Sequence, residues 1–207
     1  MNILFKTIDE SRDYYTKYVN EHIANVLKAF EIFGEDILTY RDKTFSTGKG
    51  FIANRNIIVD NHLSVHDASK FSKEEFDPYR KNFYCSEEDI TLSGMSKEEF
   101  EAVVEKEFDE AWKHHYEVNK HHPEYWKVNI SGQEQYVTMP TYAFVEMICD
   151  WIAVSMTLKS KVSSWWFGSD ACLGAREEKK NQIILKSDIE FIDNFIQKNS
   201  DRLDFSL

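Results

Sequence analysis

Apolar side chains recur at intervals of three and four residues along much of the chain, which is the period of an amphipathic helix. The first such stretch follows Thr7 and Glu10, a pair that is typical of a helix-capping box. Its apolar stripe includes His22 and reaches Phe33, and Gly34 is expected to end the helix as a left-handed cap. The pattern therefore predicts a long N-terminal helix with His22 on its buried face.

The next part of the chain shows shorter patterns. A short helix is predicted over 35–41, a loop over 46–50 and a helix over 55–67. The loop contains Gly48 and Gly50, but no strand precedes it and no full phosphate-binding fingerprint follows. The glycines are therefore weak evidence for a phosphate loop.

Two further capping boxes predict the helices in the middle of the chain. Ser72 and Glu75 are expected to begin a helix that runs toward Phe83, with Pro78 disturbing it. The box at 96–99 is expected to open a long central helix with one apolar stripe.

Four of the seven histidines lie at the end of this central pattern. His115 and His122 fall on the buried stripe, whereas His114 and His121 fall on its edge. Pro123 disfavours helical geometry at the residue before it, so His121 is an alternative to His122. Whether His114 takes the place of His115 is also left open. Histidines on a buried stripe are hard to explain as a solvated helix end.

The last third of the chain adds two acidic residues in an apolar segment. After a short β-hairpin or loop over 127–138, a helix is predicted to begin at 139–141. Glu146 and Asp150 lie one turn apart on one face of this helix. Buried carboxylates cost several kcal/mol unless they are paired, so these two need a metal, hydrogen bonds or an ion pair with a lysine or arginine. A packing helix is predicted over 187–199.

The fold class follows from these patterns. Few glycines and prolines, no internal repeat and no low-complexity linker favour one all-α domain over 1–207. We expect a bundle of six to eight helices with at most one short β-hairpin, a core over about 10–167 and the packing helix at its C-terminal end.

Composition narrows the classes of function. The net charge of −11 disfavours broad binding to duplex nucleic acid or to anionic membranes, although a local basic site for a small phosphate is compatible with it. Cys85, Cys149 and Cys172 have no paired spacing, so neither a disulfide framework nor a zinc ribbon is indicated. No apolar stretch matches a signal peptide or the ~18 residues of a membrane span, which favours a cytoplasmic protein.

Histidine and aspartate side chains on inward faces form one candidate set, although each of them alone is more often a packed core residue. The set is His22, His66, Asp67, His115, His122 and Asp150. Imidazole nitrogens and carboxylates bind divalent transition metals, here one or two ions of Mn, Fe, Co, Ni or Zn, and an aspartate can bridge two of them. Such ions lower the pKa of bound water, and two ions would also stabilise a phosphoryl displacement.

The order His … His-Asp … Asp resembles the HD superfamily of metal-dependent phosphohydrolases. The stretch His66-Asp67-Ala68-Ser69-Lys70 is similar to its cyclic-dinucleotide phosphodiesterase branch, in which a lysine three residues after the aspartate contacts phosphate. The chain departs from that branch because its later histidines lie closer together and the glycine-tyrosine-proline signature is absent.

A more specific resemblance covers about residues 15–167. The pattern of 66–79, 111–126 and 139–151, including Ala111-Trp112-x-His114-His115, is similar to an uncharacterised bacterial and phage family of unknown function. That resemblance implies an HD-like helical fold and metal site but no substrate.

The resemblance assigns roles to single residues. It implies a first ion held by His22, His66, Asp67 and Asp150, and a second, if present, held by Asp67, His115 and His122. Asp67, Lys70 and Glu146 would be the catalytic residues: Lys70 would neutralise phosphate, and Glu146 would orient a ligand histidine or transfer a proton.

Three functional hypotheses follow. The first is a metal-dependent phosphohydrolase acting on a nucleotide or other small phosphate ester, with Trp112, Tyr125, Trp126 and Trp165 as residues that could line its pocket. The second is a non-catalytic metal- or nucleotide-binding protein that sequesters its ligand, and the third is a purely structural helical domain. A site with an open, water-occupied position would favour catalysis over a structural role.

Overall fold

The computed structural model describes residues 3–45, 55–169, 172–183 and 185–206, so the predicted loop at 46–50 lies outside the described residues. Within these ranges the chain forms nine α-helices, three short 3-10 helices and three two-stranded sheets. The prediction of an all-α fold is confirmed. None of the described helices combines the length and the hydropathy that a membrane-spanning segment needs.

The chain divides into two compact units, each built from two segments. Unit 1 consists of residues 1–21 and 67–119, and unit 2 consists of residues 22–66 and 120–207. Helix α1 (Ile8–Phe45) contributes its first part to unit 1 and the remainder to unit 2. That the whole chain is a single domain stays a prediction.

The N-terminal cap of α1 is as predicted, but its C-terminal end is not. The backbone N–H of Glu10 donates to Thr7 Oγ1, and the N–H of Thr7 donates to Glu10 Oε2, each at 3.2 Å. The helix then continues through Gly34, so the predicted break there was wrong. A Cβ at Gly34 would lie 2.4 Å from Cδ2 of Phe30. The glycine therefore makes room for an aromatic ring instead of ending the helix.

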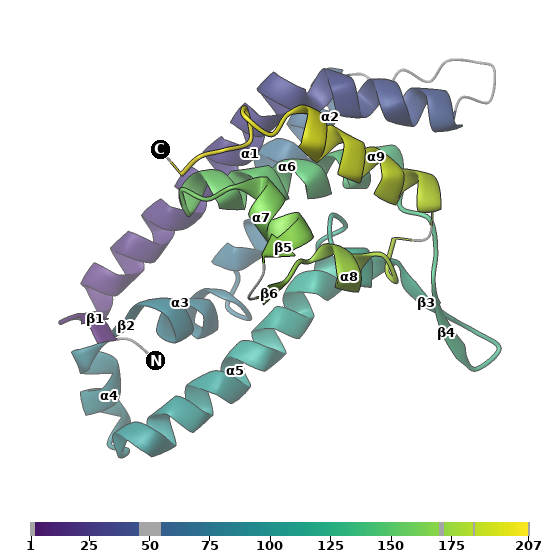
Figure 1. The fold of residues 1–207 in the computed structure, drawn as a ribbon. Coiled ribbons are helices and arrows are strands. Elements are labelled where there is room, and N and C mark those ends of the chain that lie inside the picture. Colours follow the sequence, from purple (N-terminus) through teal and green to yellow (C-terminus); the bar gives the residue numbers. More distant parts are fainter. Residues whose placement is uncertain (1–2, 46–54, 170–171, 184, 207) are drawn as a thin grey trace. The chain divides into compact units, whose positions relative to one another are not determined.

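Unit 1 is built around two neighbouring helices, α3 and α5 (Figure 1). It also contains the first part of α1 and several shorter elements, and β1 pairs with β2 in parallel. The elements are β1 (Ile3–Phe5), the first part of α1, η2 (Ala68–Phe71), α3 (Phe76–Tyr84), β2 (Cys85–Ser86), α4 (Glu87–Ser93) and α5 (Lys97–Val118).

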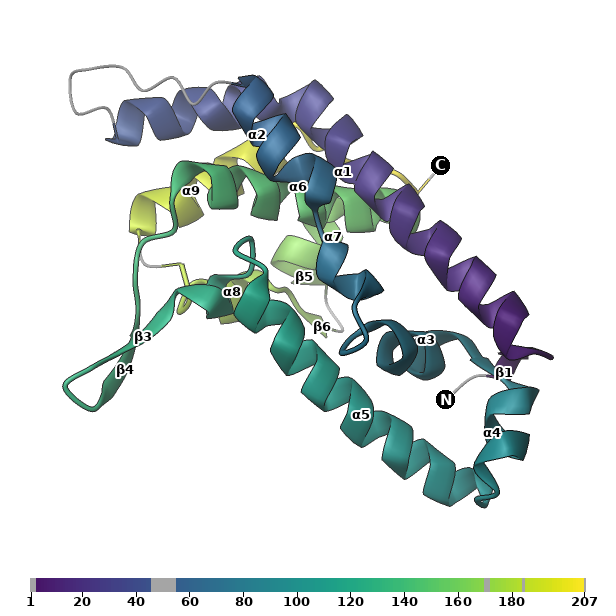
Figure 2. The ribbon, with the colours of Figure 1, turned by 180° about the vertical axis from the view of Figure 1, so that it is seen from behind.

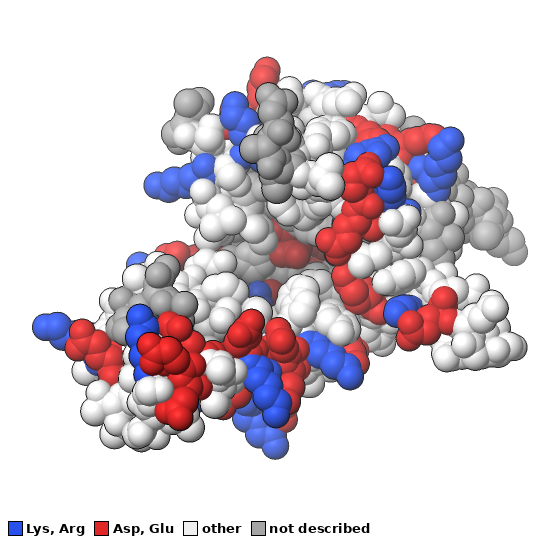
Figure 3. Space-filling view, turned by 60° about the horizontal axis from the view of Figure 1, so that its bottom comes forward, with Lys and Arg blue, Asp and Glu red and all other residues white. Residues whose placement is uncertain are grey.

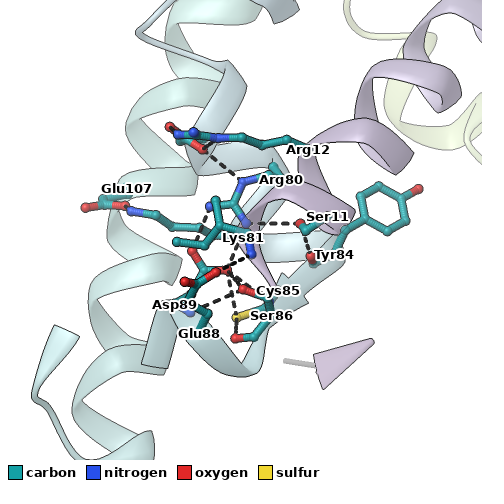
Figure 4. Close-up of polar contacts among 12 residues, drawn as sticks. Ser11, Arg12, Arg80, Lys81, Tyr84, Cys85, Ser86, Glu88, Asp89 and Glu107 are labelled. Atoms are coloured by element: carbon teal, nitrogen blue, oxygen red, sulfur yellow. Dashed lines mark hydrogen bonds and ion pairs between the residues drawn. The ribbon is translucent and has the colours of Figure 1, made fainter. Parts of the chain in front are cut away.

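A buried ion pair joins α3 to α4 in unit 1 (Figure 4). Arg80 donates through both terminal nitrogens to the two carboxylate oxygens of Asp89, at 2.7 and 2.8 Å. Asp89 also completes a capping box with Ser86, which the sequence reasoning missed. Arg80 donates in addition to Ser11 Oγ at 3.0 Å, so the guanidinium ties α1 to the same network.

Helix α5 begins at the predicted cap. Ser96 and Glu99 form a complete capping box, which confirms the predicted start. Its solvent face carries Lys-Glu pairs one turn apart, at 97/101, 106/110 and 113/117, and Figure 3 shows acidic and basic side chains mixed over this surface. The helix ends at Val118, so the predicted extension to His122 was wrong.

The predicted start of α3 was also wrong. The helix begins at Phe76, and Glu75 precedes it without making a side-chain cap. Ser72 ends the preceding turn, and Pro78 lies in the first turn of the helix, where a missing N–H costs little. The carboxylate of Glu75 is used elsewhere in the unit, as described below.

Unit 2 has its core around α6, which lies beside the later part of α1 and α9 (Figure 2), and buried residues of these three helices belong to one hydrophobic cluster. Residues 127–136 form the predicted hairpin, and two positive-φ residues, Ser131 and Gly132, make its turn. The elements are α2 (Arg55–Asn61), η1 (Leu63–Val65), η3 (Pro123–Trp126), β3 (Lys127–Ile130), β4 (Gln133–Tyr136), α6 (Thr141–Thr157), α7 (Val162–Phe167), β5 (Gly168–Ser169), β6 (Cys172–Leu173), α8 (Arg176–Lys179) and α9 (Lys186–Lys198).

Two other sequence predictions for this part of the chain need correction. The helix predicted over 55–67 ends at Asn61 and is followed by a 3-10 turn, so His66 is not helical. The last helix, predicted over 187–199, runs from Lys186 to Lys198, and the residue before it, Leu185, makes no side-chain cap. Asp188, in its first turn, accepts a hydrogen bond from the hydroxyl of Tyr40 at 2.7 Å and forms an ion pair with Arg41 at 2.9 Å.

Candidate metal centre

Three histidines and two carboxylates come together in unit 2. His22 is on the buried stripe of α1, His66 follows η1, and His121 precedes η3. Glu146 and Asp150 are one turn apart on α6 and therefore face the same way. All three imidazoles are at most 3% exposed. The group joins segments that are far apart in the sequence.

Glu146 binds two of these imidazoles through the same oxygen. Its Oε1 lies 2.9 Å from Nδ1 of His66 and 3.2 Å from Nδ1 of His121. A carboxylate accepts hydrogen bonds, so each Nδ1 carries the proton and each Nε2 of a neutral ring keeps its lone pair. Glu146 thus fixes the tautomer and orientation of both rings, as second-shell carboxylates do at metal sites.

The Nε2 atoms converge on Asp150. His22 Nε2 lies 3.2 Å from His66 Nε2 and 3.0 Å from Asp150 Oδ1. His66 Nε2 lies 3.6 Å from Oδ1, and His121 Nε2 lies 4.0 Å from Oδ2.

These distances fit a metal site. Ligand atoms bound to one tetrahedral ion at about 2.1 Å are about 3.4 Å apart; the distance between His22 and His66 and the distances of the three imidazoles from Asp150 are 3.0–4.0 Å. His66, His121 and Asp150 offer ligand atoms that all lie within 4.8 Å of one another. In metal-free protein a proton on His22 Nε2 can bridge to Asp150, and a metal ion would replace it.

Both carboxylates of this group are held in their charged form. Burial alone would raise the pKa of Asp150, but hydrogen bonds and charge interactions with His22 and His66 keep that pKa well below its ordinary value. Burial opposes the ionisation of Glu146 as well, and hydrogen bonds from His121 and His66 lower its pKa to about 2. At neutral pH the group therefore presents two negative charges to a cation.

The other predicted site residues lie in unit 1, where they form a group of their own. His115 Nε2 lies 3.3 Å from Asp67 Oδ1, and Lys70 Nζ lies 2.6 Å from Asp67 Oδ2. Asp67 is 2% exposed and follows directly after His66 in the chain. That Asp67 and His115 share an ion with residues of unit 2 stays a prediction.

Glu75 completes the group in unit 1. Its carboxylate is fully buried and contacts Nδ1 of His114 at 2.7 Å, Nδ1 of His115 at 2.8 Å and the hydroxyl of Ser69 at 3.0 Å. Burial alone would lower the pKa of His115, but Asp67 and Glu75 more than offset this effect and raise it. Asp67 and Glu75 therefore favour the protonated form of His115, whose ring lies between them.

The two pairs of histidines at the end of the central pattern are placed differently. Of the alternatives that the sequence left open, His121 contacts Glu146 and Asp150, whereas His122 is half-buried with its ring 4.3 Å from that of His121. His115 is the buried member of its pair, and His114 is about one-third exposed. A ligand role for His122 stays a prediction.

The aromatic residues that were considered as pocket walls have packing contacts. Trp165 lies beside Trp151 and Trp166, and Trp126 packs against the unit 2 core. Tyr125 packs edge-on against Trp126. In unit 1, Trp112 stacks on His115 with a ring separation of 5.7 Å and remains 41% exposed.

Comparison with protein families gives one match. The model of a family of unknown function, DUF5662, matches residues 11–198. The chain belongs to this family. Neither the curated proteins nor the solved structures include a match. The family match spans both units and includes each residue of the groups described above.

The role of Glu75 as the partner of two histidines was not predicted from the sequence. The spacing of Ser72 and Glu75 matches a capping box, and this local explanation left the carboxylate with no further role to assign. Its partners, His114 and His115, lie about 40 residues further along the chain, so only the tertiary structure identifies them.

Proposed function

We propose that the chain is a metal-dependent phosphohydrolase that acts on a nucleotide or another small phosphate ester. The observation that carries the proposal is the convergence of three imidazole Nε2 atoms on Asp150, with distances of 3.0–4.0 Å. Imidazole with carboxylate suits Mn, Fe, Co, Ni or Zn, and the resemblance to the HD superfamily supports hydrolysis of phosphate esters.

The residues of unit 2 would hold and tune the ion. His22, His66, His121 and Asp150 would be its ligands, and Glu146 would keep two of the imidazoles in the required tautomer. A bound divalent ion would supply a hydroxide nucleophile near neutral pH by lowering the pKa of its water. We place this activity in the cytoplasm, which the free, buried thiols of Cys85 and Cys149 support.

A second function is favoured by the number of ligands. Four protein ligands saturate a tetrahedral zinc ion, and closed sites of this kind are structural. A non-catalytic metal-binding protein is therefore the alternative proposal. The two proposals differ in whether the bound metal keeps a position for water or substrate.

One set of experiments tests both proposals. We expect purified protein to carry about one equivalent of metal by elemental analysis, and Asp150→Asn to lose it. A panel of phosphomonoesters and phosphodiesters with added Mn, Co or Mg should then give turnover with the wild type alone. Metal without turnover on any substrate would favour the binding protein, and absence of metal would contradict both proposals.

Lys70 separates catalysis from binding. If it neutralises substrate phosphate, Lys70→Ala should lower the turnover of an active substrate by about 100-fold at equal metal occupancy. Lys70→Arg is the matched control, because it keeps the positive charge beside Asp67. Equal rates for the alanine variant and the wild type would limit Lys70 to neutralising Asp67.

A further inference from the structure

At its far end, the segment that carries His121 is held by Trp126, which packs against the unit 2 core and whose carbonyl accepts from the N–H of Val137 at 2.8 Å. It runs from Lys120 to Trp126, between the end of α5 and β3, and includes only the short helix η3. The indole N–H of Trp126 donates to the carbonyl of Lys120 at 2.8 Å and so closes the segment on itself. This bond sets the local shape of the segment but does not anchor it to the rest of unit 2.

A second anchor, closer to His121, is provided by a polar clamp from the C-terminal part of unit 2. Glu124 Oε1 accepts from Lys179 Nζ at 3.0 Å and from Gln182 Nε2 at 3.1 Å. Lys179 also donates to Gln182 Oε1 at 2.9 Å, so the three side chains form a closed triangle.

The clamp is largely shielded from solvent. The side chains of Lys179 and Glu124 are only 14% and 19% exposed. An ion pair this far from bulk water is screened less than an exposed one and holds its geometry better. Glu124 lies three residues after His121, so its position constrains where the imidazole can lie.

We propose that Glu124, Lys179 and Gln182 are positioning residues for His121 and so set the affinity of the metal centre. The inference rests on the metal site proposed above. A ligand must be held to within about 0.5 Å to contribute fully, and the clamp is a contact that ties this ligand's segment to α8 and the residues after it. Neither Glu124 nor Lys179 touches the ligand atoms themselves.

A double-mutant cycle with Co²⁺ as the probe tests this inference. Lys179→Met removes the ammonium and keeps the aliphatic chain, and Glu124→Gln is a second variant that keeps the shape of its partner. Each should weaken Co²⁺ binding by about fivefold, below the 10–100-fold typical of a direct second-shell partner. In a His121→Ala background, whose three remaining ligands still bind Co²⁺ at higher concentration, the same changes should alter affinity by less than about twofold.

The matched control is Asp193→Asn, which weakens the ion pair of Asp193 with Arg176, another partly buried pair of unit 2. It should lower the unfolding midpoint of the metal-free protein without changing Co²⁺ affinity. The clamp variants should instead change the visible absorption of bound Co²⁺, because a displaced imidazole alters the ligand geometry.

The outcomes distinguish this inference from the proposed function. A wild-type chain that binds no Co²⁺ overturns the metal site and this inference with it. Binding by the wild type with equal losses in both backgrounds, or with no loss in the clamp variants, overturns the positioning role alone. A clamp variant that fails to fold leaves the decision to the other one, and failure of both variants to fold would assign the clamp to stability.

Discussion

The two buried histidine groups begin from the same arrangement and differ in what faces Nε2. In each unit a carboxylate binds imidazole Nδ1: Glu75 binds His115 in unit 1, and Glu146 binds His66 and His121 in unit 2. The Nε2 of His115 meets a carboxylate, whereas Nε2 of His66 meets both Asp150 and another imidazole nitrogen.

This difference changes the charge balance of the two groups. In unit 1, Asp67 and Glu75 face the ammonium of Lys70 and the ring of His115, whose protonated form they favour. In unit 2, Glu146 and Asp150 face the imidazoles of His22, His66 and His121 instead of a lysine ammonium. A carboxylate bound to Nδ1 of a histidine therefore occurs both in an internal ion pair and in a candidate cation site. Which of the two forms depends on the group that faces Nε2.

The largest effect should come from removing the charge that orients the unit 2 rings. Glu146→Gln keeps the size of the side chain but can donate as well as accept, so the tautomers of His66 and His121 are no longer fixed. We expect metal affinity to fall by about 10–100-fold, measured by competition with a chelator. A change below twofold would show that Glu146 does not orient these ligands.

The equivalent change in unit 1 should affect stability instead. Glu75→Gln removes a buried charge that accepts three hydrogen bonds. We expect the free energy of unfolding to fall by about 2 kcal/mol in urea denaturation, with metal content unchanged. Loss of metal from this variant would break the comparison, because it would show that the group in unit 1 holds an ion as well.

A pH titration of metal-free protein sharpens the same contrast. Since the pKa of His115 is raised by folding, its contribution is fully present below the ordinary histidine pKa and is lost as pH rises through the folded value. His115→Gln should therefore flatten the decline of the unfolding free energy above pH 6.5, by at most about 1.4 kcal/mol per pH unit.

The carboxylates of unit 2 act at the other end of the scale. The pKa of Glu146 is depressed to about 2, so its contribution to the unfolding free energy is present above the ordinary pKa of a glutamate and is lost as pH falls from about 4 toward 2.

For the titration above pH 6.5, an unchanged profile in His115→Gln would contradict the assignment of an imidazolium to unit 1.

The smallest effect is expected on the solvent face of α5. Glu110→Gln removes one charge of a pair in which both side chains are more than 70% exposed. Such pairs contribute little, and Lys before Glu is the weaker orientation on a helix, so the change in unfolding free energy should stay below about 0.5 kcal/mol. A larger loss would mean that exposed charges stabilise unit 1 as strongly as its buried group.

Short-range signals in the sequence predicted the helix starts at Thr7 and Ser96, because every partner of a capping box lies within one turn. The same signal failed at Ser72, where a distant pair of histidines binds Glu75. Gly34 failed for a similar reason, because a packed ring required the glycine and the helix continued past it.

The candidate site shows the same division between local and distant causes. Periodicity placed His22, Glu146 and Asp150 on inward faces, since helical geometry alone determines this. It could not choose between His121 and His122, because α5 ends at Val118 and the chain after it follows no helical period. The clamp at Glu124 could not be predicted from the sequence either, because the partners of Glu124 lie more than 50 residues away along the chain.

The backbone conformation of Asp67 limits which residues can replace it without strain. Its φ of 54° and ψ of 22° place it in the left-handed region, which aspartate, asparagine and glycine enter most readily. Asparagine and glycine are each a single nucleotide change from aspartate codons, so both are easily reached variants that keep this turn. A family member that carries either one would lack the carboxylate and still keep the left-handed turn. If such a member had lost the proposed activity, the loss would come from the side chain and not from the main chain.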